Sequence, residues 1–252
     1  MSDRLLNLKS PPIVEAVLDV DCDMPPGLDF AGLQTASQDA FRDRYPKFQV
    51  QHMQALQVEA GPDRAPNVTT KQGIRAFQFL KEDGKQLVQV RAQGFSFNRL
   101  APYSSLDDYV PEMERTWRLF VRLAAPVEVR VVRLRYINRI RLPLIEGRVK
   151  LNDYLKFGPQ LPGEDKLVLL EFLNQHHAME LETGNHVNIV LAAQPQENDM
   201  LPIILDIESF IPGNGEPNDW AAIYGKIKSL RRLKNRVFGD SLTDQCLDLF
   251  QH

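Results

Sequence analysis

Residues 127–143, VEVRVVRLRYINRIRLP, constrain the fold more than any other stretch of this sequence. From residue 132 onward, apolar and polar side chains alternate with the two-residue period of a β-strand that buries one face. The apolar set is Val132, Leu134, Tyr136, Ile140 and Leu142, with Asn138 among them. The opposite set contains four arginines, Arg133, Arg135, Arg139 and Arg141. We expect a strand with one face in the core and a row of guanidinium groups on the other.

The beginning of this stretch alternates in the opposite phase. Val127, Val129 and Val131 are separated by charged residues, whereas the apolar residues from Val132 onward fall on even numbers. One extra residue in a β-bulge reverses which face a strand presents. A bulge or a twist near residues 131–132 would reconcile the two phases, and so would an apolar face shared with a second layer.

Three interpretations of the arginine row remain open, and the last of them is an incidental solvated face. Carboxylates alternate along two other predicted strands. Glu15, Asp19, Asp21 and Asp23 share a face of the strand at residues 13–22 and its end, and Asp206 and Glu208 share a face of the strand at residues 201–210. Opposite charges on neighbouring strands stabilise pairing and fix its register, so the arginines form an internal ladder in the first interpretation. In the second, the row binds phosphate groups, because a planar guanidinium group binds phosphate through two hydrogen bonds. We favour the ladder.

Composition excludes several classes of protein. The chain has 252 residues and a net charge of −3, which fits one large or two small globular domains and argues against a nucleic-acid coat protein. Cys22 and Cys246 have no metal-binding or redox spacing, which favours a reducing compartment. The sequence has no signal-peptide pattern and no apolar run of about 20 residues, so we expect a cytoplasmic protein without membrane contact.

Periodicity in the rest of the chain predicts an α+β fold with a largely antiparallel sheet, long hairpins and three main helices. Helix N-caps are expected at Asp29 and Ser105, and a terminal helix is expected from about Asp219 to Phe238. Strands are expected over residues 13–22, 51–60, 74–81, 86–97 and 201–210, with a long hairpin over 167–194.

The predicted domain organisation has two halves. Residues 1–143 form a first α+β half, residues 144–166 are a connection rich in proline and glycine, and residues 167–252 form a second α+β half. The likeness of VLDVD at 17–21 to ILDIE at 204–208 allows the two halves to be similar. One continuous domain is the alternative.

The terminal helix carries a second cluster of cations. Its apolar stripe is Trp220, Ile223, Ile227, Leu230 and Val237. Its cations are Lys226, Lys228, Arg231, Arg232, Lys234 and Arg236. We expect a solvated basic face, with Arg231 and Arg232 as candidates for binding an anion, nucleic acid or an acidic protein.

No metal site, cofactor site or catalytic group is predicted. His176 and His177 point to opposite sides of a strand, which separates the ligands that NQHHAMELETGNH offers. The sequence contains no GxSxG nucleophile motif and no glycine-rich phosphate loop. Asp19 and Asp21 share a strand face and are the one pair that suggests Mg²⁺.

Six stretches together resemble a bacterial protein family. They are SPPIVEAVLDV, FSFNRLAPYSSLDDYVPEMERTWRLF, RLRYINRIRLP, FGPQLPG, ILDIESF and VFGDSLTDQCLDLF. The family is a sporadically distributed group of uncharacterised bacterial proteins of similar length, and RYIN at 135–138 is the most specific piece of the resemblance. The resemblance spans nearly the whole chain. It implies a single fold and an accessory gene of mobile-element or defence regions, but no activity.

Three functional hypotheses follow. The first is a non-enzymatic cytoplasmic binding or regulatory protein that acts through protein–protein contact, with a homodimer as one expected assembly. The alternative is a nucleic-acid or nucleotide-phosphate binding protein that uses the arginine row and the terminal helix. The third is a Mg²⁺-dependent phosphoesterase that uses Asp19 and Asp21.

Overall fold

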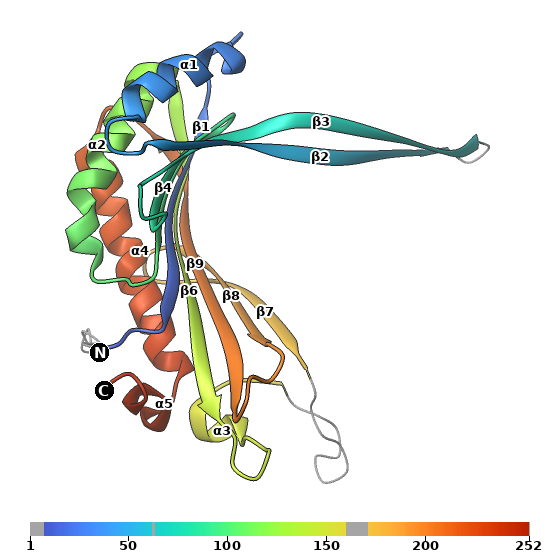
Figure 1. Ribbon diagram of the computed structural model, residues 1–252, viewed down its shortest axis with the longest axis vertical. Coiled ribbons are helices and arrows are strands. Elements are labelled where there is room, and N and C mark those ends of the chain that lie inside the picture. Colours follow the sequence, from blue (N-terminus) through green and yellow to red (C-terminus); the bar gives the residue numbers. More distant parts are fainter. Residues whose placement is uncertain (1–7, 62–63, 160–170, 252) are drawn as a thin grey trace.

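A single antiparallel sheet of nine strands forms the body of the protein (Figure 1). The computed structural model describes residues 8–61, 64–159 and 171–251. The strands are β1 (Ile13–Asp23), β2 (Lys47–Gly61), β3 (Arg64–Leu80), β4 (Gln86–Arg91), β5 (Gly94–Leu100), β6 (Glu128–Pro143), β7 (Leu173–Met179), β8 (His186–Ala193) and β9 (Met200–Gly215). They lie in the order β2-β3-β4-β5-β1-β6-β9-β8-β7. The helices are α1 (Phe30–Phe41), α2 (Leu106–Ala124), α3 (Leu151–Tyr154), α4 (Trp220–Ser241) and α5 (Asp244–Asp248).

Helices α1 and α2 begin at the predicted capping residues Asp29 and Ser105, and α4 begins directly after Asp219, where the terminal helix was expected to start. The side chains of Asp29, Ser105 and Asp219 each accept a hydrogen bond from a backbone N–H in the first turn of α1, α2 and α4. These bonds satisfy donors that have no partner within the helix. The predicted α+β class and the largely antiparallel sheet are confirmed.

The single strand expected over residues 86–97 was wrong. β4 ends at Arg91, the chain reverses at residues 92 and 93, and β5 begins at Gly94. Gly94 has a φ of +144°, and a Cβ added there would lie 2.1 Å from the carbonyl oxygen of Val20 on β1. Only glycine allows this backbone conformation and so close an approach, and the tight turn brings β5 directly beside β1.

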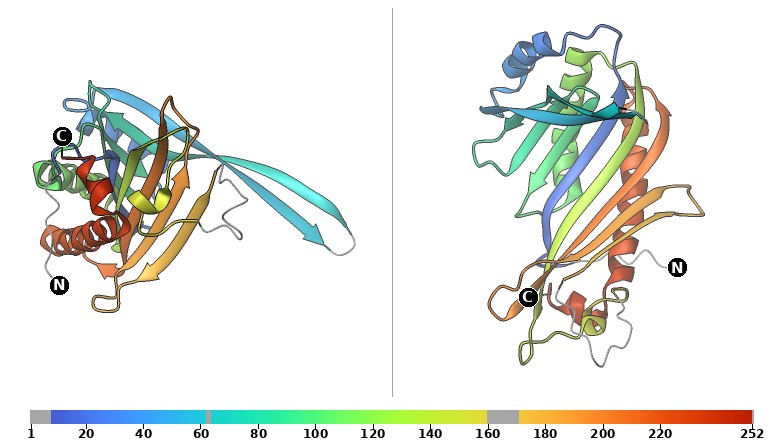
Figure 2. Two further views of the ribbon diagram at one scale, coloured as in Figure 1. Left: turned by 90° about the horizontal axis from the view of Figure 1, so that it is seen from below. Right: turned by 90° about the vertical axis from the view of Figure 1, so that its right-hand side faces the viewer.

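Helices α1, α2 and α4 cover one face of the sheet (Figures 1 and 2). The other face, which these three helices leave uncovered, is called the open face below. One hydrophobic cluster lies beneath α1, α2 and the first half of α4, and a second lies beneath the end of α4 with α3 and α5. The layered arrangement makes the central strands β1, β6 and β9 bury one face and leave the other partly exposed, whereas β7 at the sheet edge has no buried residue.

β6 follows the predicted alternation. Its side chains at Val132, Leu134, Tyr136, Ile140 and Leu142 are at most 1% exposed. A bulge is present, but the irregular pairing lies between Val129 and Val131, slightly earlier than predicted. Arg130 is therefore the residue at which the two phases of the strand meet.

The sheet continues across the sequence boundary between the expected halves. β6 pairs with β1 on one side and with β9 on the other, where the pairing runs from Val129 to Pro143. Residues 160–170 lie outside the described residues, and they include the end of the expected connection and the start of the expected 167–194 hairpin. Within the described residues no helix combines the length and apolar character that a membrane span requires.

The β2–β3 hairpin extends far from the body of the protein (Figure 1). Its pairing runs from Lys47 opposite Leu80 to Gly61 opposite Arg64. β4 pairs with β3 only over Ala76–Leu80, so the outer part of the hairpin is a ribbon of two strands.

Candidate functional site

Most of the predicted arginine row is paired on the open face. Arg133 binds the carboxylate of Asp21 on β1. Arg135 binds Asp206 on β9 with its Nε 2.9 Å from Oδ1, and a second bond runs from Nη2 to Oδ2. The ladder interpretation is therefore confirmed for these two arginines and for the two strands predicted to supply the carboxylates.

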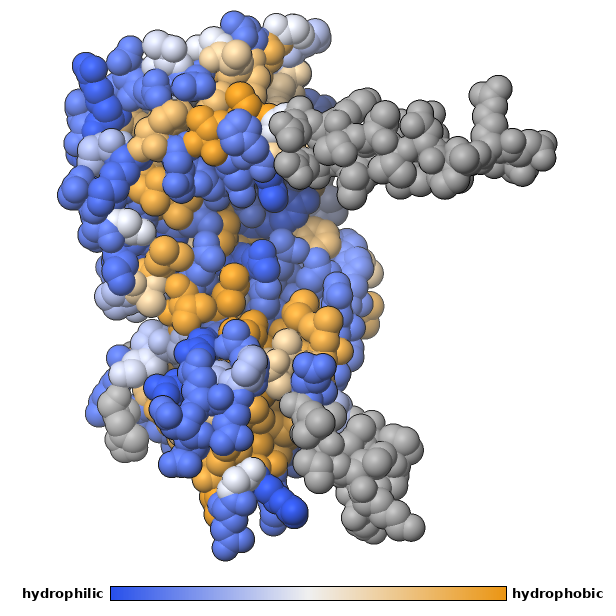
Figure 3. Space-filling view, turned by 45° about the vertical axis from the view of Figure 1, so that its right-hand side comes forward, coloured by the Kyte–Doolittle hydropathy of each residue, from blue (hydrophilic) through white to orange (hydrophobic). Residues whose placement is uncertain are grey.

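A hydrogen-bonded network extends from the ladder across the other half of the open face. Side-chain amides relay hydrogen bonds from β2 to β5, with donor–acceptor distances of 2.7, 3.0 and 3.1 Å, through Gln49, Gln78, Gln89 and Asn98. Asn98 then donates to Glu15 on β1 at 2.7 Å. Polar groups on this face thus satisfy one another, which fixes strand register and leaves few donors free for a ligand. Figure 3 shows the molecule turned toward this side, with mixed hydrophilic and hydrophobic surface.

The remaining predicted site residues lie apart. Arg139 binds Glu197 at 2.6 Å and Gln194 at 2.8 Å, beyond the predicted acidic strands. Arg141 and Arg232 are exposed, and neither has an ion pair among the described residues. Arg231 lies on the inner side of α4, where it lines a pocket on the helix-covered side of the sheet. The structure therefore does not bring the six candidate arginines together.

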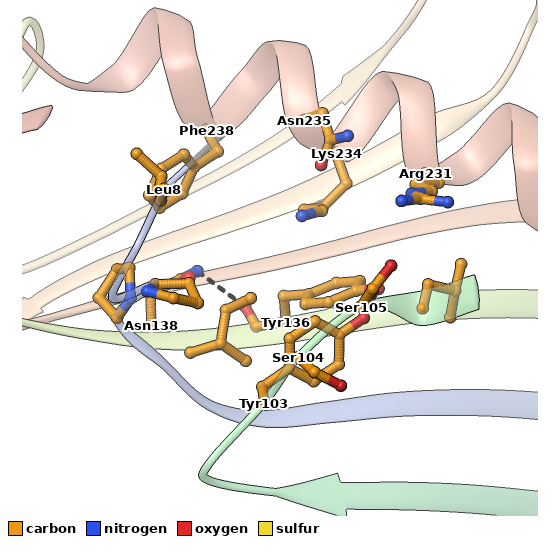
Figure 4. Close-up of a pocket in the computed structure, with 14 residues that line it drawn as sticks. Leu8, Tyr103, Ser104, Ser105, Tyr136, Asn138, Arg231, Lys234, Asn235 and Phe238 are labelled. Carbon is orange, nitrogen blue, oxygen red and sulfur yellow. Dashed lines mark hydrogen bonds between the residues drawn. The ribbon is translucent and has the colours of Figure 1, made fainter. Parts of the chain in front are cut away.

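This pocket, called the Tyr136 pocket below, has a volume of about 420 Å³ (Figure 4). Four segments enclose it: the chain before β1, the link between β5 and α2, the middle of β6, and α4. Its lining residues are Leu8, Pro11, Pro12, Ile13, Tyr103, Ser104, Ser105, Leu106, Tyr136, Asn138, Arg231, Lys234, Asn235 and Phe238. The volume falls within the range that suits a small organic ligand.

Lys234 is the unusual residue of the Tyr136 pocket. It is only 8% exposed, and among the described residues its amine has neither a carboxylate partner nor a hydrogen bond. The amine lies 3.9 Å from the centre of the Tyr136 ring, a cation–π contact. Burial, together with the nearby charge of Arg231, lowers the pKa of Lys234 to about 7. Such an amine is poised between its neutral and charged forms at physiological pH.

Two tyrosine hydroxyls face the same space. The hydroxyls of Tyr103 and Tyr136 lie 3.0 Å apart, and their rings pack edge to face. Burial raises the pKa of Tyr136 to about 12 and raises the pKa of Tyr103 still further. Both therefore keep their protons at neutral pH. Because one hydroxyl donates to the other, the second retains a proton that can be donated to a ligand.

Arg231 is held at the outer end of the Tyr136 pocket. Its Nη1 lies 2.8 and 2.9 Å from the two carboxylate oxygens of Asp107, in the first turn of α2. Ser104, Ser105 and Leu106 place the start of α2 at the pocket wall. Backbone N–H groups at a helix start carry partial positive charge, which adds to the positive character of this end.

The histidines and aspartates considered for metal binding do not form such a site. His177 and His186 contact each other at 3.2 Å, and His176 packs against Phe157 instead. Asp19 and Asp21 are both contacted by Arg91. Within the described part of the chain, no group of three or more histidine, cysteine, aspartate or glutamate side chains is arranged to hold a metal ion.

Comparison with known proteins adds no constraint on this site. Neither a protein-family model nor a curated protein matches the sequence.

Sequence reasoning missed the central residue of the Tyr136 pocket although a signal was present. The apolar stripe of α4 includes Ile227 and Leu230. Lys234 follows Ile227 by seven residues and Leu230 by four, so it lies on the same face of the helix. Helical spacing therefore places a lysine where the stripe requires an apolar residue. Grouping Lys234 with the exposed cations of the helix concealed this conflict.

The ladder predicts that replacing two arginines of the row by alanine lowers the stability of the fold by unequal amounts. We expect Arg135→Ala to lower the free energy of unfolding by about 1–3 kcal/mol, because it removes both hydrogen bonds to a charged carboxylate. The side chain of Asp206 is only 13% exposed, so water replaces the lost partner poorly. Arg141→Ala is the matched control, and we expect a change within about 0.5 kcal/mol. Urea denaturation measures both, and equal losses would contradict the ladder.

Lys234 predicts a pH-dependent stability. Its pKa is about 7 in the folded protein and 10.5 in an ordinary lysine, so between these values the unfolded chain binds a proton that the folded protein lacks. The folded protein therefore loses stability as pH falls from about 10 to 7, by up to about 1.4 kcal/mol per pH unit, and levels off below 7. Lys234→Met removes this dependence. The groups facing the amine, Arg231, Tyr103 and Tyr136, keep their protonation state over this range.

Urea denaturation at several pH values measures this difference. We expect the Lys234→Met protein to become progressively more stable than the unmodified protein as pH falls from 10 to 7. The control is Lys228→Met, because Lys228 is an exposed lysine of the same helix that also lies over a tyrosine ring. A constant difference between Lys234→Met and the unmodified protein would show that Lys234 titrates normally.

Proposed function

We propose that this protein is a non-enzymatic cytoplasmic binding protein that holds a small anion in the Tyr136 pocket. The observation that supports this proposal is the buried amine of Lys234, which reaches a cavity without a carboxylate partner among the described residues. A charge buried without a counter-ion costs several kcal/mol. A bound anion supplies the missing counter-ion, so binding and protonation of Lys234 favour each other.

The other groups of the Tyr136 pocket suit the same ligand. Arg231 brings guanidinium N–H donors although Asp107 already balances its charge. The Tyr103–Tyr136 pair retains one hydroxyl proton, and the N-terminus of α2 lies at the pocket wall. Hydrogen bonds from such donors to a charged acceptor are stronger than those between neutral groups. The lining residues include no histidine, cysteine or carboxylate, and the hydroxyls of Ser104 and Ser105 contact Tyr109 and the backbone of α2 rather than Lys234.

The cytoplasmic placement in this proposal rests on the cysteines. Cys22 and Cys246 are both free and buried. Burial raises the pKa of each thiol to about 12, which keeps both in the unreactive thiol form. Two unpaired thiols are ordinary in a reducing compartment. Nucleic acid is not part of the proposal, because three of the four arginines of the row already have carboxylate partners.

Calorimetric titration with acetate tests the proposal, because acetate stays ionised throughout the pH range used. At pH 8 the empty pocket holds Lys234 mainly as the neutral amine, so acetate binding should take up close to one proton, seen as a dependence of the binding enthalpy on the buffer. At pH 6 the uptake should be near zero. Affinity should fall about tenfold per pH unit above 8.

Variants identify the site. Lys234→Met should weaken acetate binding at least tenfold and abolish proton uptake, whereas Lys228→Met should leave both unchanged. If acetate fails to bind, or binds equally well to the Lys234→Met protein without proton uptake, the proposed function is wrong.

A second candidate function is protein–protein contact through the β2–β3 hairpin. Between Ala76 and the tip of the hairpin, β3 pairs only with β2 among the described residues. A ribbon of two strands is marginally stable alone in water. A partner surface would stabilise it. We propose a second copy of this chain as that partner, because the hairpin extends well beyond the body (Figure 1) and can reach a neighbouring molecule.

Shortening the hairpin tests this second candidate. His52 and Ile74 lie opposite each other, so residues 53–73 can be replaced by Asn-Gly, which favours a two-residue turn. We expect sedimentation velocity to give a dimer for the full chain and a monomer for the shortened one. The same oligomeric state for both proteins would reject the hairpin as the dimer contact.

A further inference from the structure

The charge of the Tyr136 pocket limits its ligand to a single negative charge. Arg231 is already neutralised by the two carboxylate oxygens of Asp107. Lys234 is therefore the one cation of the lining without a carboxylate partner among the described residues. A monoanion matches this charge, whereas a phosphate dianion would bring an unmatched charge into a buried site.

Charged groups and apolar groups lie toward different ends of the Tyr136 pocket (Figure 4). Arg231 and Ser105 lie at one end, Lys234 and Tyr136 in the middle, and Leu8 and Phe238 at the other end. Asn138 also lies toward Leu8, but its amide already donates to the carbonyl oxygens of Tyr136 and Leu205. Arg231 and Phe238 are seven residues apart on α4, or about 10 Å along the helix axis. The pocket is therefore long enough for a ligand with an anionic end and an apolar body.

The apolar end is built from fixed backbone. Pro11 and Pro12 line it together with Leu8. The N–H of Ser10 donates to the carbonyl oxygen of Phe250 at 3.0 Å, and the carbonyl oxygen of Pro12 accepts from the N–H of Arg139 at 2.8 Å. Anchored at both ends and stiffened by two prolines, this segment can contact a ligand without losing much further freedom.

We propose that the ligand is a small monocarboxylate with an apolar body. Its carboxylate pairs with the Lys234 amine and accepts the free hydroxyl proton of the Tyr103–Tyr136 pair. Its aliphatic chain or ring lies toward Leu8 and Phe238. This inference rests on the proposed anion-binding function and adds the class of ligand.

A series of linear acids tests the apolar body. Acetate, butanoate, hexanoate and octanoate carry the same carboxylate and differ only in chain length. If each added CH₂ is buried against Leu8 and Phe238, affinity should rise about three- to fourfold per CH₂ until the pocket is filled. Calorimetric titration of the full chain at pH 7, below the concentrations at which octanoate forms micelles, gives the dissociation constants.

One variant separates the apolar contact from the anionic one. Leu8→Ser should reduce the gain in affinity per CH₂, and urea denaturation shows whether the variant is folded. Leu181→Ser is the matched control, because Leu181 is 93% exposed and lies outside the lining. Its chain-length dependence should equal that of the unmodified protein.

The outcomes distinguish this inference from the function on which it rests. If acetate and inorganic phosphate bind as tightly as octanoate, the pocket accepts anions but the apolar body is wrong. If octanoate binds equally well to the Lys234→Met protein and acetate does not bind, both the carboxylate contact and the proposed function are wrong. Affinity that rises with chain length and depends on both Leu8 and Lys234 supports the inference.

Discussion

The pairing of β6 with β1 and β9 is the interaction on which the rest of the structure depends. This central strand divides its side chains between two environments because successive residues point to opposite faces. On the open face, Arg133 and Arg135 meet carboxylates of the two flanking strands, which fixes the register of all three. On the covered face, Tyr136 enters the core and forms the floor of the pocket. A one-residue slip of β6 would reverse both faces together.

Alternation made β6 and its acidic neighbours predictable from sequence. A two-residue period is local, so Arg133, Arg135 and the carboxylates of β1 and β9 could each be placed on a face without knowledge of the tertiary structure. Arg139 was harder, because its partners Gln194 and Glu197 lie near the turn between β8 and β9, where no period applies. The reversal before Gly94 was missed because its reason is the approach to Val20, a contact between distant segments.

The Tyr136 pocket could be predicted only in part. Lys234 occupies the apolar stripe of α4, so its inward position follows from spacing alone. Its environment does not, because Tyr103, Tyr136 and Leu8 come from three other segments that only the folded sheet and helices bring together. The change in the pKa of Lys234 depends on burial and on Arg231, and burial is a property of the whole fold.

The arrangement of the Tyr136 pocket has a consequence for synthesis of the chain. Leu8 is made early, Tyr136 near the middle, and Lys234 only when α4 is complete. The hydrogen bond between Ser10 and Phe250 also joins the two ends of the described chain. Both partners of the β1–β6 pair are therefore synthesised well before the last wall of the pocket. The pocket that we propose for the ligand is complete only after translation has passed α4.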